Sequence, residues 1–349
     1  GVCFVYGTNT SASHDTCVCL EGWYGVTCSV PHVVWTDPSF RGWYAQGQIR
    51  RRRRPRTIIS AFLLNHEIAM LDIRIHVLGD AVDYYVVSES NYTLFGSAKP
   101  LFISSNLSAG FLSKQRHKIV LLSSGINYAN DEDPWATESN LRSLLWRQGR
   151  HLLKGLRDDD LFMISDADEI PSRELMLFLK YHDGFGEPVS MGLRWFLYGF
   201  FWENRRPVIV SGICTVAYLR EVYGDDSNLV RRNERGLAMH NARTSDAGTV
   251  RTSWTVKGVP PKYAGWHCSW CFDITGIQFK LTSSQRDDGI RWGNFAENSD
   301  ASHIQLLREQ GRYFDKSAPL KRADGYRAAP DYLLQDPRRW RYLLELSRL

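Results

Sequence analysis

The sequence predicts an α/β fold, in which a mostly parallel sheet carries helices on both faces. Apolar runs with the length of buried strands occur at 58–64, 82–87, 119–122 and 161–164. Between the first two runs, apolar residues recur at helical spacing at Ile68, Leu71, Ile75 and Leu78. This alternation is typical of parallel strands, because their crossover connections are usually helices.

Two prolines place the next helices, since proline is favoured at the first helical position. A helix is predicted from Pro134, with Leu141, Leu144, Leu145 and Leu152 on its apolar face. Another is predicted to open at Pro171 and to carry Leu175, Phe178 and Leu179. Several polar residues then fall at strand ends, where open α/β sheets bind ligands: Asn65, Glu67, Glu89, Asp166 and Asp168.

Length and charge limit the classes of function. The 349 residues suit one large domain with a small appendage. The formal charge of +5 is local, because the five arginines of 50–54 account for all of it. We therefore expect no nucleic-acid partner. No apolar stretch approaches the ~20 residues that span a bilayer, so any membrane anchor is expected upstream of this chain.

The cysteines indicate an oxidising compartment. Four of the seven lie within the first 28 residues, and sequons for N-glycosylation occur at Asn9, Asn91 and Asn106. The string Cys17-Val-Cys19, followed by Gly22-Trp23 and by Gly25 before Cys28, resembles the second half of an EGF-like module. That resemblance implies a Cys19–Cys28 bridge, with Cys3–Cys17 as the second. We expect residues 1–30 to form a structural clasp rather than a separate binding module.

Residues 31–56 have the composition of a linker. They contain Pro31, Pro38, Pro55 and the arginine run at 50–54. The run is interpreted as a solvated loop, and the alternative is a site for a furin-like protease, so cleavage there stays open.

The acidic segment from Ser165 to Pro171 directly follows an apolar strand. In an extended chain Asp166 and Asp168 point the same way, and their oxygens suit Mg²⁺ or Mn²⁺. Such an ion could neutralise a departing diphosphate. The alternative is that these acids cap the helix expected at Pro171.

Longer strings extend this pattern and resemble glycosyltransferase family 17 from Cys17 to about Leu344. They are Cys17-Val-Cys19 with Gly22-Trp23, Asn65-His66-Glu67, Leu71-Asp72, Glu89-Ser90-Asn91, Asp166-Ala167-Asp168-Glu169-Ile170-Pro171, Leu197 to Trp202, Val210-Ser211-Gly212, Gly265 to Phe272, and Arg291-Trp292-Gly293. The arginine run, and Ser165 where the family is expected to have an acid, are departures from it.

The resemblance implies a type II membrane protein of the Golgi lumen that uses UDP-GlcNAc and Mn²⁺. It implies transfer with inversion to O4 of the core β-linked mannose of N-glycans on glycoproteins. The implied fold is of the GT-A type over 57–349, with a nucleotide-sugar and metal half at 57–190 and an acceptor half at 191–349. Which N-glycans are accepted, and the oligomeric state, stay open.

The family pattern also implies roles for individual residues. Asp168 is the first metal ligand, and Asp166 contacts the metal or the ribose. Contacts to uridine are expected from Asn65, Glu67 and Glu89. The general base is expected to be Asp288 or Glu169, although Asp288 equally suits a surface turn.

The second half supplies the remaining candidates. His267 is expected at the metal or the diphosphate, or as a hydrogen-bonded structural residue. Acceptor contacts are expected from Trp266, Trp270, Tyr198 and Arg194, with core packing as the alternative for the two tryptophans. Cys214, Cys268 and Cys271 are too few for a structural zinc site, so a disulfide among them with one free thiol is expected.

Two other functions are consistent with parts of the sequence. A metal-dependent phosphoesterase or nucleotidyltransferase would use the same carboxylates. A non-enzymatic extracellular protein would depend on the EGF-like segment instead.

Overall fold

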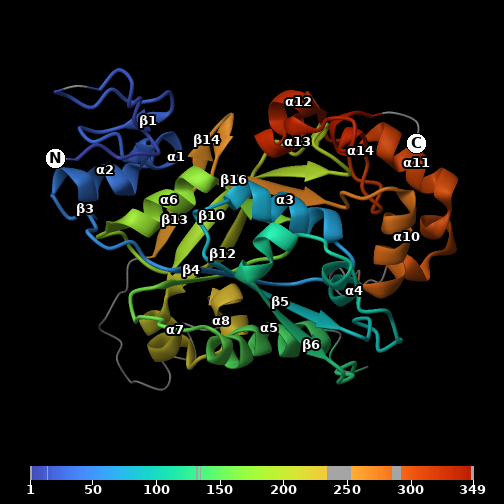
Figure 1. Cartoon of the computed structure of the whole chain (residues 1–349). Coiled ribbons are helices and arrows are strands. Elements are labelled where there is room, and N and C mark those ends of the chain that lie inside the picture. The colour runs from blue at the N-terminus through green and yellow to red at the C-terminus, as the bar shows by residue number, and fades with distance from the viewer. Residues whose placement is uncertain are drawn as a thin grey trace.

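A large mixed sheet forms the centre of the computed structural model, which describes residues 2–13, 15–130, 133, 135–233, 253–284 and 292–346 (Figure 1). Its strand order is β17-β11-β10-β12-β7-β4-β5-β6, and β13, β16 and β8 pair outside this path. The parallel part comprises β7 (Leu161–Ile164), β4 (Ile58–Leu63), β5 (Tyr84–Ser90) and β6 (Ile119–Ser124). The four strands predicted from apolar runs are thus confirmed.

Alternating side chains of these strands face two different layers of helices. On β4, Ile58 and Phe62 lie in one hydrophobic cluster, whereas Ile59 and Ala61 lie in another. The first face is covered by α3 (Ile68–Leu78) and α6 (Arg173–Tyr181). The second is covered by α5 (Ala136–Gly149), α7 (Val216–Tyr223) and α8 (Ser227–Arg231), as Figure 1 shows. The predicted helices on both faces are therefore confirmed.

Antiparallel pairing dominates the second half of the sheet. Strand β12 (Val208–Thr215) runs antiparallel to β7 and to β10 (Val189–Leu197). Gly212 allows the close contact with β7, because a Cβ there would lie 2.0 Å from the Ile164 carbonyl oxygen. Strand β16 (Gly265–Ser269) is parallel to β10 and antiparallel to β8 (Glu169–Pro171), which brings His267 beside the acidic segment.

Two predicted helix starts are shifted. Pro171 ends β8, and α6 begins after Ser172, whose hydroxyl accepts from the Leu175 amide. The acidic segment therefore does not cap this helix. Helix α5 begins at Ala136, and Leu152, expected on its apolar face, is exposed in the 3-10 turn η2 (Arg150–Leu152).

The N-terminal segment packs against α6. Disulfides join Cys3 to Cys17 and Cys19 to Cys28, which confirms both predicted bridges. The buried Phe4 ring contacts Tyr181, with centroids 5.2 Å apart. The segment also includes β1 (Trp23–Tyr24) and β2 (Val30–Pro31).

Residues 31–56 differ from the expected linker. They form α1 (His32–Trp35), α2 (Pro38–Ala45) and β3 (Arg50–Arg51), and Phe40 is fully buried. The arginine run is only partly solvated, because Arg52 forms ion pairs with Asp159 and Asp183. These tertiary partners could not be seen in the local composition.

The remaining elements are short or lie at the carboxyl-terminal side. They are α4 (Phe102–Ser108), η1 (Ser113–Lys118), β9 (His182–Asp183), β11 (Trp202–Glu203), β13 (Trp254–Val256), β14 (Gly258–Val259), β15 (Lys262–Tyr263), α10 (Ile274–Ser283), η3 (Trp292–Asn294), η4 (Ala296–Ser299), α11 (Ala301–Gln310), β17 (Lys321–Arg322), α12 (Gly325–Ala328), α13 (Asp331–Gln335) and α14 (Arg341–Leu344). Within the described residues, no helix is long and apolar enough to cross a bilayer.

Candidate active site

A cavity of about 430 Å³ opens at the carboxyl ends of β4, β5 and β7. The chain passes from β4 to β5 and β6 on one side, and then returns to place β7 on the other side of β4. The cavity therefore lies at the switch in strand order, which is where open α/β sheets bind their ligands. Its walls come from these strand ends, from α5, and from β16, Trp270 and α10 of the second half.

The acidic segment forms a turn between β7 and β8 rather than an extended strand. The Glu169 amide donates to the Asp166 carbonyl oxygen at 3.1 Å. Arg74, fully buried on α3, donates to the same carbonyl at 3.0 Å and to that of Glu169 at 2.8 Å. It also donates to the Ser165 hydroxyl at 2.7 Å. A single buried guanidinium thus holds both ends of the turn.

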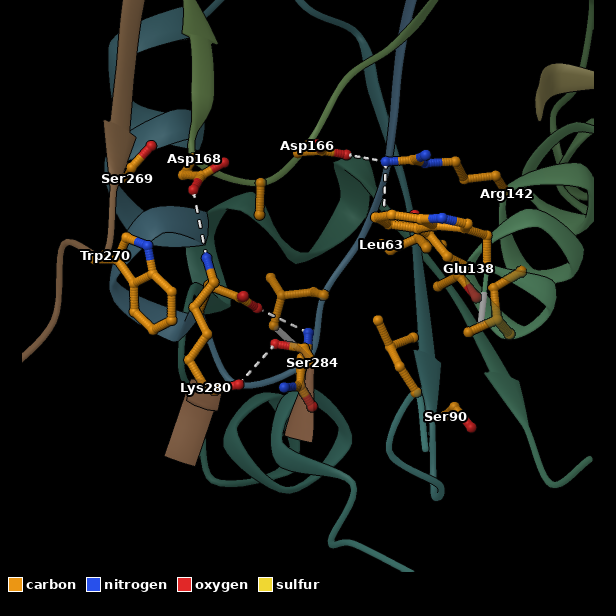
Figure 2. Close-up of a pocket in the computed structure, with 18 of the residues that line it drawn as sticks. Leu63, Ser90, Glu138, Arg142, Asp166, Asp168, Ser269, Trp270, Lys280 and Ser284 are labelled. Atoms are coloured by element: carbon orange, nitrogen blue, oxygen red, sulfur yellow. Dashed lines mark hydrogen bonds and ion pairs between the residues drawn. The ribbon is translucent and has the colours of Figure 1, made fainter. Parts of the chain in front are cut away.

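The turn sends its two aspartates in different directions, as Figure 2 shows. Asp166 receives hydrogen bonds from Arg142 at 2.6 Å and from Arg231 at 3.2 Å. Burial alone would raise the pKa of Asp166, but these two arginines outweigh it and hold the pKa well below its usual range. Asp166 is therefore an anion whose oxygens already have cationic partners.

Asp168 faces the opposite part of the cavity. The Lys280 Nζ lies 3.6 Å from its Oδ2, and the His267 Nε2 lies 3.8 Å from its Oδ1. Burial lowers the pKa of the Lys280 ammonium, but the Asp168 and Glu67 carboxylates outweigh this effect and raise it. Neither nitrogen is within hydrogen-bond distance, so the Asp168 oxygens are available to a ligand.

These contacts bear on whether a divalent ion fits. Asp168 supplies an open carboxylate, and the neighbouring His267 has a buried Nδ1 with no hydrogen-bond partner in the described structure. Among the described residues, no group of three or more His, Cys, Asp or Glu side chains is placed to hold an ion. The arrangement suits Mn²⁺ or Mg²⁺ held by one carboxylate, with substrate phosphate oxygens and water completing the shell. As it stands, Asp166 is not available for that role.

Further polar side chains line the cavity. Asn65 and Glu67 are among them, and the Asn65 Oδ1 is buried without a described partner. Glu67 accepts from the Asn65 and His66 amides at 2.8 and 3.1 Å. Opposite them, α5 contributes Glu138, whose carboxylate is 3.0 Å from Arg142. Burial raises the pKa of Glu138, and Arg142 only partly offsets this.

Several predicted site residues lie outside the cavity. Glu89 is fully buried and accepts from the Ile103 and Ser104 amides at the start of α4. Glu169 is buried beneath the turn, where it accepts from the Asp166 amide at 2.7 Å and pairs with Arg231 at 2.8 Å. Neither carboxylate reaches the space that a substrate would occupy. Asp288 lies outside the described residues.

Three of the four expected acceptor contacts have other partners. Tyr198 is fully buried and donates to the Arg312 carbonyl oxygen at 2.9 Å. The Trp266 indole donates to the Ala328 carbonyl oxygen at 2.9 Å, and Arg194 forms a two-pronged ion pair with Glu203. Of the four, only Trp270 lines the cavity.

Trp270 is presented by a four-residue disulfide loop. Cys268 is bonded to Cys271, and Cys214 is a buried free thiol, which confirms the expected bridge and single thiol. Trp270 has a left-handed backbone conformation, with φ of 57°, which residues other than glycine rarely adopt. The adjacent Ser269 lines the cavity and hydrogen-bonds the His267 Nε2 at 3.0 Å. The bridge therefore anchors both ends of a cavity wall.

Five charged residues that line the cavity were not predicted from the sequence: Lys99, Glu138, Arg142, Arg232 and Lys280. Glu138 and Arg142 lie one helical turn apart on α5, beside the buried Leu141 and Leu145. Charged residues next to the apolar face of a helix could have been recognised from the sequence as site candidates. Lys280 lies in the segment Ile274–Ser283, where nothing local marks it. Only the packing of α10 brings it to Asp168.

Known proteins resemble this chain over most of its length. The model of Glycosyltransferase family 17 matches residues 26–211. The beta-1,4-mannosyl-glycoprotein 4-beta-N-acetylglucosaminyltransferase of Rattus norvegicus is 39% identical over 345 residues, covering 97% of this chain and 63% of the rat protein. The Homo sapiens protein of the same name is 39% identical over 335 residues, covering 94% and 62%. The chain thus spans less than two thirds of the length of these relatives. It belongs to glycosyltransferase family 17.

Proposed function

We propose that this chain transfers GlcNAc from UDP-GlcNAc to O4 of the core β-linked mannose of N-glycans, with inversion and with assistance from Mn²⁺. The observation that carries the proposal is the cavity at the strand switch, where Asp168 presents an open carboxylate. The names of the 39% identical relatives specify both the GlcNAc group and the mannosyl glycoprotein acceptor. We further propose that 57–349 is a GT-A type catalytic domain, with 1–30 as its clasp.

The cavity has polar groups that suit both parts of a nucleotide sugar. We assign the nucleoside to the wall with Asn65 and Glu67, beside the carboxyl ends of β4 and β5. We assign the diphosphate to the region of Asp168, where Lys280 adds a positive charge. His267 lines the same cavity, and we propose that it contacts the diphosphate.

The reaction needs positive charge at the leaving group and a base at the acceptor. A divalent ion, when bound at Asp168, would supply positive charge to the leaving diphosphate. The acceptor hydroxyl also needs a base. Glu67, Glu138 and Asp166 already have amide or arginine partners. We therefore retain Asp288 as the proposed base; the other predicted candidate, Glu169, is buried beneath the turn and paired with Arg231.

The location follows from the same proposal. We place the chain in the Golgi lumen as part of a type II membrane protein, where UDP-GlcNAc and glycoproteins are the partners. The three disulfides support an oxidising compartment.

The test is transfer to a defined acceptor. The chain is incubated with UDP-GlcNAc, Mn²⁺ and a biantennary N-glycan, and the linkage of any added HexNAc is mapped. We expect one GlcNAc on O4 of the core mannose. Asp288→Asn should bind UDP normally but turn over at least about 100-fold more slowly. Absence of transfer from any nucleotide sugar would exclude the proposal, and phosphate release without an acceptor would favour a phosphoesterase.

A further inference from the structure

We propose that Lys280 is a built-in cation for the diphosphate of the donor, which it contacts directly beside Asp168. This inference rests on the proposed function and adds one residue to it. The Lys280 Nζ is 3.6 Å from the Asp168 Oδ2 and lines the same cavity, as Figure 2 shows. An ammonium at that position can donate to phosphate oxygens held against the same end of the cavity.

Carboxylates lie near the Lys280 ammonium, but within the described structure none of them is hydrogen-bonded to it. The side chain is 16% exposed, and none of its three N–H groups makes a hydrogen bond within the described structure. Its closest ring neighbours are Trp270 and Phe272, each with a centroid 5.5 Å from Nζ. Elsewhere in the chain, the buried Lys180 has a carboxylate at 2.7 Å and two carbonyl oxygens within reach. Lys280 therefore keeps N–H donors that are open to phosphate oxygens.

The rings also restrict where the ammonium can go. Trp270 is held by the Cys268–Cys271 loop, and its indole donates to the Tyr313 hydroxyl at 3.1 Å. With aromatic faces beside it, the ammonium is positioned toward the cavity rather than into solvent. A preorganised charge of this kind stabilises a developing anion without reorganisation during the reaction.

The role in the reaction is electrostatic. The bond between the sugar C1 and the diphosphate oxygen breaks, and its electron pair stays on that oxygen. The acceptor oxygen forms the new bond to C1, and its proton goes to the base. Lys280 keeps its own proton throughout and donates hydrogen bonds to the diphosphate oxygens.

Two readouts test this role, and neither uses turnover. In EDTA, calorimetry measures the affinities of the intact chain for UDP and for uridine. We expect the wild type to prefer UDP, and Lys280→Met to lose about 10- to 100-fold of that preference while uridine binds as before. Lys280→Arg should keep most of it. The exposed Lys154→Met is the matched control and should keep the full ratio.

The second readout is the affinity for Mn²⁺, which the same substitution is expected to increase. Without nucleotide, Lys280 and a divalent ion compete for Asp168, so Lys280→Met should bind Mn²⁺ more tightly in titrations followed by electron paramagnetic resonance. A purely structural role would weaken both ligands together.

The outcomes separate the two proposals. An unchanged ratio of UDP to uridine affinity in Lys280→Met overturns the role of Lys280, and the ratio is insensitive to partial unfolding because both ligands bind the same folded fraction. A wild-type chain that is folded but binds no UDP even with Mn²⁺ overturns the proposed function instead.

Discussion

Arg74 is predicted to control both stability and donor binding, although it does not line the cavity. It is fully buried on α3 and donates to the Asp166 and Glu169 carbonyl oxygens, which are the two ends of the acidic turn. Arg74→Met keeps the length of the side chain and removes every one of these donors. The turn would then lose its support from α3.

The magnitude follows from the groups left unpaired. A buried acceptor without a partner costs about 1–3 kcal/mol. The Asp166 carbonyl oxygen keeps the Glu169 amide at 3.1 Å, so the Glu169 carbonyl oxygen is the acceptor that loses its main donor, and the Ser165 hydroxyl at 3.3 Å satisfies it only in part. We therefore expect a loss of about 1–3 kcal/mol in the free energy of unfolding. The displaced turn should also weaken UDP binding in Mn²⁺ by at least about tenfold.

Urea unfolding, followed by tryptophan fluorescence, and calorimetry with UDP measure the two effects. The matched control is Arg308→Met, which removes another fully buried arginine whose partners include the Tyr342 carbonyl oxygen, away from the cavity. It should lose stability while its folded fraction binds UDP normally. The reasoning fails if Arg74→Met binds UDP like the wild type, or if the two variants lose UDP binding equally.

Three further predictions concern the turn, the disulfide loop and pH. Asp168→Asn should fold normally but lose Mn²⁺-dependent UDP binding by about 100-fold or more in calorimetry; retained binding would exclude Asp168 as the ligand. Replacing Cys268 and Cys271 by alanine should lower UDP affinity, whereas removing an N-terminal bridge should lower only the melting temperature. Burial, aided by nearby arginines, lowers the pKa of His182 to about 4, so it stays neutral while bonded to Ser29. Neutral His182 contributes about 3 kcal/mol to the free energy of unfolding above pH ~6.5, and this contribution is lost as the pH falls through ~4. In urea titrations across that pH range, His182→Gln should therefore show a weaker dependence of the free energy of unfolding on pH.

Local pattern was sufficient for the parallel strands and for the position of Asp168. Apolar runs of strand length followed by polar residues place strand ends, and strand ends in a parallel sheet converge on one edge. The same rule correctly predicted that Glu89 lies at the end of a strand, but its side chain does not line the cavity. A position at the end of a strand does not determine on which side of the sheet the side chain lies. The Glu89 carboxylate is bound by amides of α4 instead of facing the cavity.

Segments that depend on distant partners were harder to predict. The composition of 31–56 indicates a linker, yet Arg52 and Arg56 bind carboxylates and carbonyl oxygens that lie more than 100 residues further along the chain. The extended geometry expected for the acidic segment also gave way to a turn, because buried Arg74 binds its carbonyl groups.

The sequence by itself determined the alternation of strands and helices and an acidic segment after a buried strand. These depend on neighbours along the chain, whose spacing is visible in the sequence. The N-terminal disulfides followed from the resemblance to an EGF-like module. Only the tertiary structure decided that Asp166 is bound by two arginines while Asp168 stays open beside Lys280. Those partners come from α5, α8 and α10, and long-range packing, rather than local pattern, brings their charges to the turn.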